Sequence, residues 1–443
     1  MIESLKNVFA VSELRKRVLF TLGLLAVYRV GSKIPTPGIN PEALRALMQS
    51  ASSGMFGLYD MFSGQNLSQM TIFALGIMPY ISASIILQLL TVVWPYLERL
   101  SKEGELGRRK ITQYTRYGTI LLAVVQALGI AIFLERNTEM AGGLPLVYEP
   151  GWSFRLLTIL TLTTGTTFVM WLGEQITERG IGNGMSLLIT FSILERLWPG
   201  TLQLLQFIRG GVVTPIGAVA FLAILVAVIA AVVAMTIAAR RIPIQIPRKV
   251  MDRGRIREGQ KTFIPIRLIT AGVMPIIFAQ TIIIVPGTLA SFTKNPILTE
   301  IASFFNPGDL PYDLTFAVLI LIFSYFYTSI IFNSVDLAEN LKKQGAFIPG
   351  VKPGASTADY IDSVLARVTL PGGLFLAAVA LVPVLVSKWV GVQSQFGGTS
   401  VLIVVGVLLD TIAQVEQHRT LRKYDGFMKT GRVKFRGRQQ RYM

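Results

Sequence analysis

Ten runs of mostly apolar residues recur along the chain, separated by polar connections. Most are close to the length of about 20 residues that an α-helix needs to cross a bilayer. They lie at roughly 18–32, 71–93, 117–134, 154–173, 184–197, 215–238, 269–290, 314–332, 368–386 and 399–413. The first and fifth runs are short, which favours helices packed inside a bundle or tilted at its edge. The pattern predicts an all-α polytopic membrane protein with ten transmembrane helices.

The second run, 71–93, is unusual for a helix that faces lipid. Gly76 and Pro79 interrupt its first half, and polar side chains such as Gln88 follow. In a membrane such groups are tolerated where neighbouring helices or a cavity satisfy them. The preceding segment, 55–67, is too short to span and mixes apolar with polar residues. We expect a half-helix that dips into the membrane and a second helix that lines a path; a surface loop before an ordinary bundle helix is the alternative.

Composition and charge narrow the class further. The 443 residues are 52% hydrophobic and only 15% charged, whereas soluble proteins carry about 25% charged residues. The net charge is +17, and with the N-terminus inside, most of the 42 Lys and Arg fall in cytoplasmic segments, as the positive-inside rule requires. Ten spans with both termini cytoplasmic are therefore expected. Five helices per half would give two halves of opposite orientation, as in many transport proteins.

Residues suited to catalysis or metal binding are scarce. The chain has no cysteine and one histidine, His418, which excludes thiolate chemistry and His-clustered metal sites. Glu174 and Glu178 could suggest acid–base chemistry, but their position before a glycine-rich turn is more simply that of a helix end. Arg29 and Asp410 lie near the ends of runs, so no central ionisable group suggests ion coupling. We expect no enzymatic activity, no metal and no cofactor.

Two loops on the predicted cytoplasmic side are too patterned to be simple connectors. The first, 240–267, contains an alternating Ile and Pro stretch typical of an extended strand, and then a basic tip at 253–257. The second, 336–367, begins with a helical pattern and turns through a Gly- and Pro-rich tip at 345–354. We expect ordered hairpins that dock a partner; solvated loops without a partner are the alternative.

Five longer motifs resemble the SecY family, the channel subunits of the bacterial Sec protein translocase. They are GIMPYISASI, GRRKITQYTRYG, WLGEQITERGIGNG, NLKKQGAFIPG and FGGTS, which begin at residues 76, 107, 171, 340 and 396. The resemblance runs from about residue 14 to 414. It implies a clamshell of two inverted five-helix halves around an hourglass pore. The N-terminal half would be 1–200 and the C-terminal half 201–418, followed by a basic cytoplasmic tail at 419–443.

The resemblance also implies roles for four sets of residues. An apolar pore ring would consist of Ile77, Ile81, Ile189, Ile277 and Ile403. A plug beneath it would consist of Phe56, Gly57, Leu58, Tyr59, Asp60, Met61, Phe62, Ser63, Gly64, Gln65 and Asn66. A lateral gate, between the second and third helices on one side and the seventh and eighth on the other, would include Gln88, Gln126, Gln280 and Thr281. The docking loops would use Arg253, Arg255, Arg257 and Lys352. The family commonly carries Arg at the last position, so Lys352 keeps the charge but loses the bidentate geometry of a guanidinium.

The implied function is passive conduction of unfolded secretory polypeptides, with transmembrane segments released sideways into lipid. SecA or the ribosome would drive the chain, signal sequences and nascent chains would enter at the gate, SecE would clamp the halves, and SecG is a further expected partner. The expected location is the bacterial inner membrane, and no small-molecule substrate is expected. A secondary transporter for a small solute and a membrane-embedded enzyme are the competing classes. The lack of central ionisable residues weighs against the first, and the lack of catalytic motifs weighs against the second.

Overall fold

The computed structural model describes residues 12–44, 47, 60, 63–136, 145–211, 214–245, 250–251, 255–256, 261–292, 309–390 and 398–430. Within these residues, ten helices correspond to the ten predicted runs. They are α2 (Ser12–Gly31), α5 (Met78–Val93), α7 (Glu105–Arg136), α8 (Trp152–Arg179), α9 (Gly184–Arg209), α10 (Pro215–Ile237), α11 (Met274–Phe292), α13 (Leu310–Ile331), α15 (Ala355–Val390) and α16 (Gly398–Thr430).

Hydropathy alone identifies most of these helices as membrane-spanning. Among the described residues, six helices are apolar and long enough to cross a membrane, or seven if α5 and α6 (Pro95–Lys102) form one bent span. The bend between α5 and α6 is 98°. It falls at Trp94, whose ψ of 112° leaves the helical region, because a residue before proline is restricted to extended conformations.

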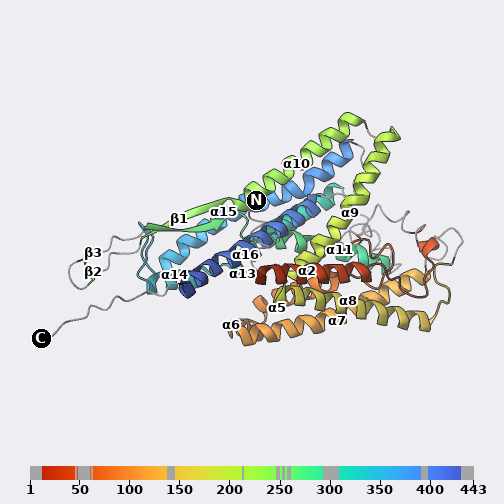
Figure 1. Cartoon of the computed structure of the whole chain (residues 1–443), viewed down its shortest axis with the longest axis horizontal. Coiled ribbons are helices and arrows are strands. Elements are labelled where there is room, and N and C mark those ends of the chain that lie inside the picture. Colours follow the sequence, from red (N-terminus) through yellow and green to blue (C-terminus); the bar gives the residue numbers. More distant parts are fainter. Residues whose placement is uncertain are drawn as a thin grey trace.

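The helices pack in two groups. In the N-terminal group, α7 lies between α5 and α8, and α8 also contacts α2 and α9. In the C-terminal group, α13 contacts α11 and α15, while α10, α15 and α16 contact one another. Figure 1 shows the two groups side by side. They meet where α9 contacts α16 and where α11 contacts α5 and α7, so each group contains five of the ten helices.

Several helices continue beyond the apolar runs that predicted them. Helix α7 begins at Glu105 rather than near 117, and α15 begins at Ala355 rather than near 368. Helix α16 continues to Thr430, into the segment predicted as a tail. Apolar runs mark the stretch suited to hydrocarbon, whereas residues such as Lys, Arg and Glu have good helix propensity and extend the helix into water. Helix α9 continues to Arg209, so the predicted division at 200 falls within its last turns and stays a prediction.

The first part of the second run is not helical, which corrects the prediction. Residues 64–77 form turns before α5 begins. Gly76 has a φ of +56°, which glycine adopts without steric cost. Pro79 lies at the start of α5, where its missing N–H leaves no hydrogen bond unmade. Thr71 forms an isolated bridge with Pro35, which joins this turn region to the segment after α2.

The two loops predicted to dock a partner are joined into one unit. In the first, β1 (Ala239–Gln245) pairs antiparallel with β4 (Lys261–Arg267), and β2 (Val250–Met251) pairs with β3 (Arg255–Ile256). This hairpin extends away from the end of α10 (Figure 1). In the second loop, α14 (Ser334–Lys343) supplies the helix that the sequence predicts. Gln245 and Phe347 exchange backbone hydrogen bonds of 2.9 and 3.0 Å, which links the loops.

Apolar side chains from both loops share small cores. One contains Ile242, Ile266, Ile348, Ile361 and Leu365, and a second contains Ile244, Leu341 and Ala346. The strand and helix expected in these loops are confirmed. Their packing on each other was not expected, because the contacting residues lie up to a hundred or so positions apart in the sequence.

Candidate functional site

The five isoleucines predicted for the pore ring all belong to one buried apolar cluster. Their exposed fractions are 3% for Ile77, 7% for Ile81, 2% for Ile189, 3% for Ile277 and 0% for Ile403. They come from the start of α5 and from α9, α11 and α16, so both helix groups contribute. The cluster is larger than the five residues, and their function as a ring stays a prediction.

Part of the predicted plug lies beside α2 and α9, two helices of the N-terminal group. Asp60, Ser63, Gly64, Gln65 and Asn66 are described, whereas 56–59, 61 and 62 lie outside the described residues. The Ser63 hydroxyl donates to the Asp60 carbonyl at 3.1 Å, and the Ser68 amide donates to Asp60 Oδ1 at 2.9 Å. These bonds close a compact turn between Asp60 and Ser68, at the end of the predicted plug.

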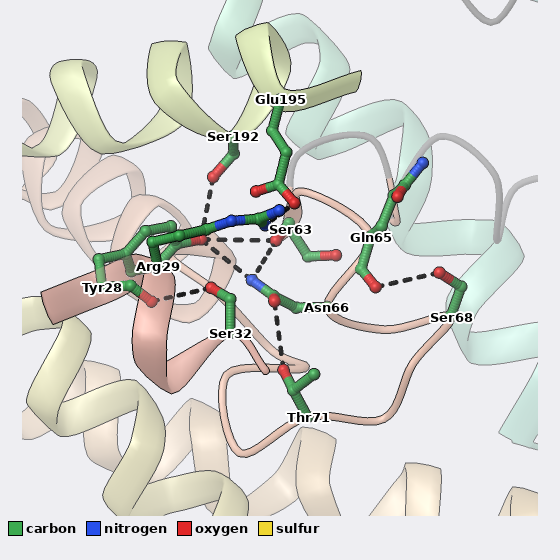
Figure 2. A network of polar contacts seen from close by, with 10 residues as sticks. All are labelled: Tyr28, Arg29, Ser32, Ser63, Gln65, Asn66, Ser68, Thr71, Ser192 and Glu195. Atoms are coloured by element: carbon green, nitrogen blue, oxygen red, sulfur yellow. Dashed lines mark hydrogen bonds and ion pairs between the residues drawn. The ribbon is translucent and has the colours of Figure 1, made fainter. Parts of the chain in front are cut away.

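A buried polar network ties this turn to two helices. Tyr28 Oη on α2 lies 2.9 Å from Ser192 Oγ on α9 and accepts a hydrogen bond from Asn66 Nδ2 at 3.1 Å (Figure 2). Arg29 and Glu195, from the same two helices, form an ion pair beside it. Apart from Asn66, none of these was predicted as a site residue. Glu195 falls in the fifth run, so ionisable residues within the runs are not limited to Arg29 and Asp410.

The predicted lateral gate lies where α5 and α7 face α11 and α13. Tyr327 on α13 donates a hydrogen bond of 2.6 Å to Gln88 Oε1 on α5, and Gln88 Nε2 donates to Ser84 Oγ at 3.0 Å. The Tyr327 ring packs edge-on against Phe278 of α11, with ring centroids 4.9 Å apart. One of the predicted gate residues therefore links the two helix groups directly.

Two other predicted gate residues, Gln280 and Thr281, bond to partners within the C-terminal group. Gln280 is 1% exposed and donates to Tyr312 Oη at 3.3 Å, which joins α11 to α13. Thr281 donates to the Ile277 carbonyl at 2.7 Å, within α11. Gln126 is half-buried on α7. Tyr312 and Tyr327, which bond Gln280 and Gln88, are partners that the sequence did not single out, because aromatic residues in an apolar run look like ordinary packing residues.

The predicted docking residues belong to the two joined loops, 240–267 and 336–367, which we call the loop unit. Arg255 is on β3, and Arg253 and Arg257 lie outside the described residues. Lys352 has an exposed side chain, and its carbonyl accepts a hydrogen bond from Thr357 Oγ1 at 2.9 Å. That bond fixes the turn that presents Lys352 before α15.

The carboxylates weighed for catalysis have structural positions. Glu174 accepts a hydrogen bond of 2.7 Å from Arg116 Nε, which ties the end of α8 to α7. Glu178 is exposed on the last turn of α8. Asn183 then caps α9 by accepting from the Met185 amide at 3.1 Å. Among the side chains that the structure describes, no group of three or more His, Asp or Glu could hold a metal ion.

Two five-helix groups with a shared apolar centre and a polar link across their seam define a class: multi-pass helical membrane proteins built from two halves. Comparison with known proteins gives the family. The SecY family model matches residues 71–412. The chain is 46% identical over 430 residues to protein translocase subunit SecY of Aquifex aeolicus, a match that covers 97% of this chain and all of the relative. The chain belongs to the SecY family.

Solved structures agree with this fold. A structure described as that of a protein conducting channel has a TM-score of 0.65 at 15% identity, over 93% of this chain and 94% of that one. Sec61 in the canine ribosome–channel complex has a TM-score of 0.60 at 15% identity, over the same shares. The ten-helix clamshell predicted from the sequence is thereby confirmed. Membership of the SecY family supports a protein channel rather than a small-solute transporter, and no enzyme family is indicated.

Proposed function

We propose that this chain is the pore-forming subunit of a bacterial Sec translocon. It passes unfolded secretory polypeptides across the inner membrane and releases transmembrane segments sideways into lipid. The observation that carries this proposal is the buried isoleucine set: five apolar, β-branched side chains from both helix groups, next to a seam that the Tyr327–Gln88 hydrogen bond bridges. Membership of the SecY family supplies the substrate class.

The five isoleucines form the constriction in this proposal. Ile77 and Ile81 belong to the N-terminal group together with Ile189, and Ile277 and Ile403 belong to the C-terminal group. A ring of aliphatic side chains excludes water and ions when closed. It also offers no fixed hydrogen-bond partners, so polypeptides of any sequence can pass. Parting of the two groups widens the ring.

The plug and the gate complete the channel. The plug, 56–66, covers the ring from beneath and moves aside when a polypeptide enters. The lateral gate opens along the seam between α5 and α7 on one side and α11 and α13 on the other. A signal sequence enters there because its apolar helix can exchange contact with the gate helices for contact with lipid.

The joined loop unit is the proposed docking surface for SecA or the ribosome. Its basic residues, Arg253, Arg255, Arg257 and Lys352, suit acidic protein surfaces and RNA phosphates. The ribosome-bound channel among the structural relatives supports the second partner. SecE would clamp the two groups together and SecG would join them. Both termini would be cytoplasmic, which places the loop unit and the basic tail on the side where these partners are found.

Reconstitution into proteoliposomes tests the function. With SecE, SecA and ATP, a secretory polypeptide added outside should become protected from protease, and protection should require its signal sequence. Liposomes that lack this chain are the control. Failure to protect any secretory polypeptide, together with saturable uptake of a small solute, would contradict the proposal.

A further inference from the structure

We propose that the Tyr28 hydroxyl holds residues 63–71, which begin with the last four residues of the predicted plug, to α2 and α9, so that this segment stays with the N-terminal helix group when the channel opens. We call residues 63–71 the plug root. The inference rests on the proposed function, since a root that stays fixed matters only if the two groups part. It assigns a positioning function to Tyr28 and Ser192, which lie outside the predicted ring, plug and gate.

The Tyr28 hydroxyl is the centre of the network. It lies 2.9 Å from Ser192 Oγ, accepts from Asn66 Nδ2 at 3.1 Å, and lies 3.5 Å from the Ser63 carbonyl. Asn66 Nδ2 also donates to that carbonyl, and Asn66 Oδ1 accepts from Thr71 Oγ1 at 3.2 Å. Figure 2 shows these side chains converging from α2, α9 and the plug root. Both ends of the root are thus connected to one hydroxyl group.

Burial makes these bonds costly to break. Tyr28 is 1% exposed, Asn66 and Thr71 are 2% exposed, and Ser63 and Ser192 are fully buried. Water cannot replace a lost partner at such positions, so a buried polar group left unpaired costs roughly 1–3 kcal/mol. Moving the root away from α2 would leave several such groups unpaired together. Displacing the plug root from α2 therefore costs free energy, which favours the root staying in place.

Ring packing and charge hold the two anchoring helices in place. The Tyr28 ring stacks on Phe73 with centroids 5.6 Å apart and planes 1° apart, and it meets Phe191 of α9 edge-on at 6.4 Å. The ion pair between Arg29 and Glu195 lies one residue from Tyr28 on α2 and three residues from Ser192 on α9. Since α2 and α9 both belong to the N-terminal group, the network ties the root to that group.

Backbone hydrogen bonds also hold the plug root to the N-terminal group. The Thr36 amide donates to the Met70 carbonyl at 2.7 Å, and the Ile72 amide donates to the Ile34 carbonyl at 3.0 Å. These bonds join the end of the root to the chain that follows α2. They add to the side-chain network that keeps the root on the N-terminal group.

Distances between spin labels test this directly, because the natural chain has no cysteine to remove. One label is placed at Gln69, which is exposed in the root. Its partner is either on α2 at Leu22 (54% exposed) or on α13 at Val318 (45% exposed). When a stalled secretory polypeptide occupies the channel, the Gln69–Leu22 distance distribution should stay unchanged and the Gln69–Val318 distribution should shift to longer distances.

Tyr28→Phe isolates the hydroxyl, since it keeps the stacked ring. It should broaden the Gln69–Leu22 distribution in the resting channel, and Ser192→Ala should do so to a smaller extent. Tyr325→Phe is the matched control: this hydroxyl donates to the Ala366 carbonyl at 3.2 Å, within the C-terminal group, and its loss should leave the distribution unchanged.

Three results would separate the possible failures. If the stalled polypeptide shifts the Gln69–Leu22 distance as much as the Gln69–Val318 distance, the channel opens but the root is not fixed, and the inference is wrong. A Gln69–Leu22 distribution that stays as narrow in both Tyr28→Phe and Ser192→Ala as in the natural chain would also overturn it. If no polypeptide can be stalled in the channel at all, the proposed function fails and the inference fails with it.

Discussion

Gly64 shows how closely the plug root approaches α9. Its φ is +70°, and a Cβ added there would lie 2.8 Å from Ser192 Cβ. A non-glycine residue in the left-handed region costs about 1–3 kcal/mol before any clash. Gly64→Ala should therefore destabilise the protein by more than the backbone cost alone. Thermal unfolding in detergent can be followed through the reactivity of a single cysteine at the buried Ser324 position (4% exposed).

Gly104 provides the matched control for that change. Its φ is +73°, but a Cβ there meets no atom within 4 Å. Gly104→Ala carries the same backbone cost without the clash, so it should lower the unfolding temperature less than Gly64→Ala. Equal effects of the two variants would mean that the contact with Ser192 contributes nothing.

Tyr327 carries a second residue-scale prediction. Tyr327→Phe removes the 2.6 Å hydrogen bond to Gln88 but keeps the ring against Phe278. A typical hydrogen bond contributes about 1 kcal/mol, so the open-gate population should rise by about 5-fold. Spin labels at Ile86 on α5 and Ile330 on α13, both exposed, report that population. An unchanged population would show that this bond does not hold the gate shut.

Sequence reasoning could place motif residues but not their tertiary partners. Ile77 and Ile81 stand in the motif at 76–85, whereas Gln88 and the other ring isoleucines are assigned from the order and spacing of the whole resemblance. Tyr28 and Ser192 lie 164 positions apart, and each alone looks like an ordinary polar residue in an apolar run. Only the folded chain brings them within hydrogen-bonding distance.

At the scale of elements, α7 and α8 are fastened at both ends. Arg116 bonds Glu174 near one end, and Arg155 bonds Glu135 at 2.7 Å near the other. Glu135 is 8% exposed and also accepts from the Gly151 amide at 3.0 Å. These pairs make α7 and α8 one unit, so gate opening should move them together.

A double-mutant cycle on Arg155 and Glu135 tests this fastening. Charge-assisted hydrogen bonds contribute about 1.5–3 kcal/mol, so Arg155→Ala and Glu135→Ala should show a coupling free energy of that order in thermal or denaturant unfolding. Lys343 and Glu339 form the control pair, since their side chains are 73% and 62% exposed and exposed pairs couple weakly. Equal coupling in the two pairs would contradict the assignment.

The loop unit carries the second element-scale prediction. Arg255→Glu reverses a charge at the β3 tip, and it should reduce SecA- or ribosome-dependent translocation, more strongly at low salt where charge interactions reach further. Arg179→Glu is the control, because Arg179 is exposed at the end of α8, on the same predicted side but outside both loops. Normal translocation by Arg255→Glu would mean that the first loop is only a charged connector.

Element boundaries show why periodicity alone falls short. The run at 71–93 predicted a helix interrupted in its first half at Gly76 and Pro79, but 71–77 is not helical and α5 begins only at Met78. The strand in the first loop was predictable because Ile and Pro alternate at 242–244. The bridge between Gln245 of this strand and Phe347 could not be predicted, because a single backbone pairing does not alter the hydrophobic pattern of either segment.

At the scale of the whole molecule, the ten runs and their charge pattern were enough to predict two halves of five helices. The contacts bear out this division, since α9 meets α16 and α5 meets α11 at the boundary between the groups. What the pattern could not supply is the set of bonds that cross or flank this boundary. Those bonds decide which parts move together when the groups separate.

Crosslinking from position 403 tests the central claim, that an exported polypeptide passes through the isoleucine ring. Ile403 is fully buried on α16, whereas Leu408 on the same helix is 43% exposed. A single cysteine at 403 should form a disulfide with a cysteine in the middle of a stalled secretory polypeptide, and a cysteine at 408 should not. A stalled polypeptide that crosslinks at 408 but never at 403 would contradict the account.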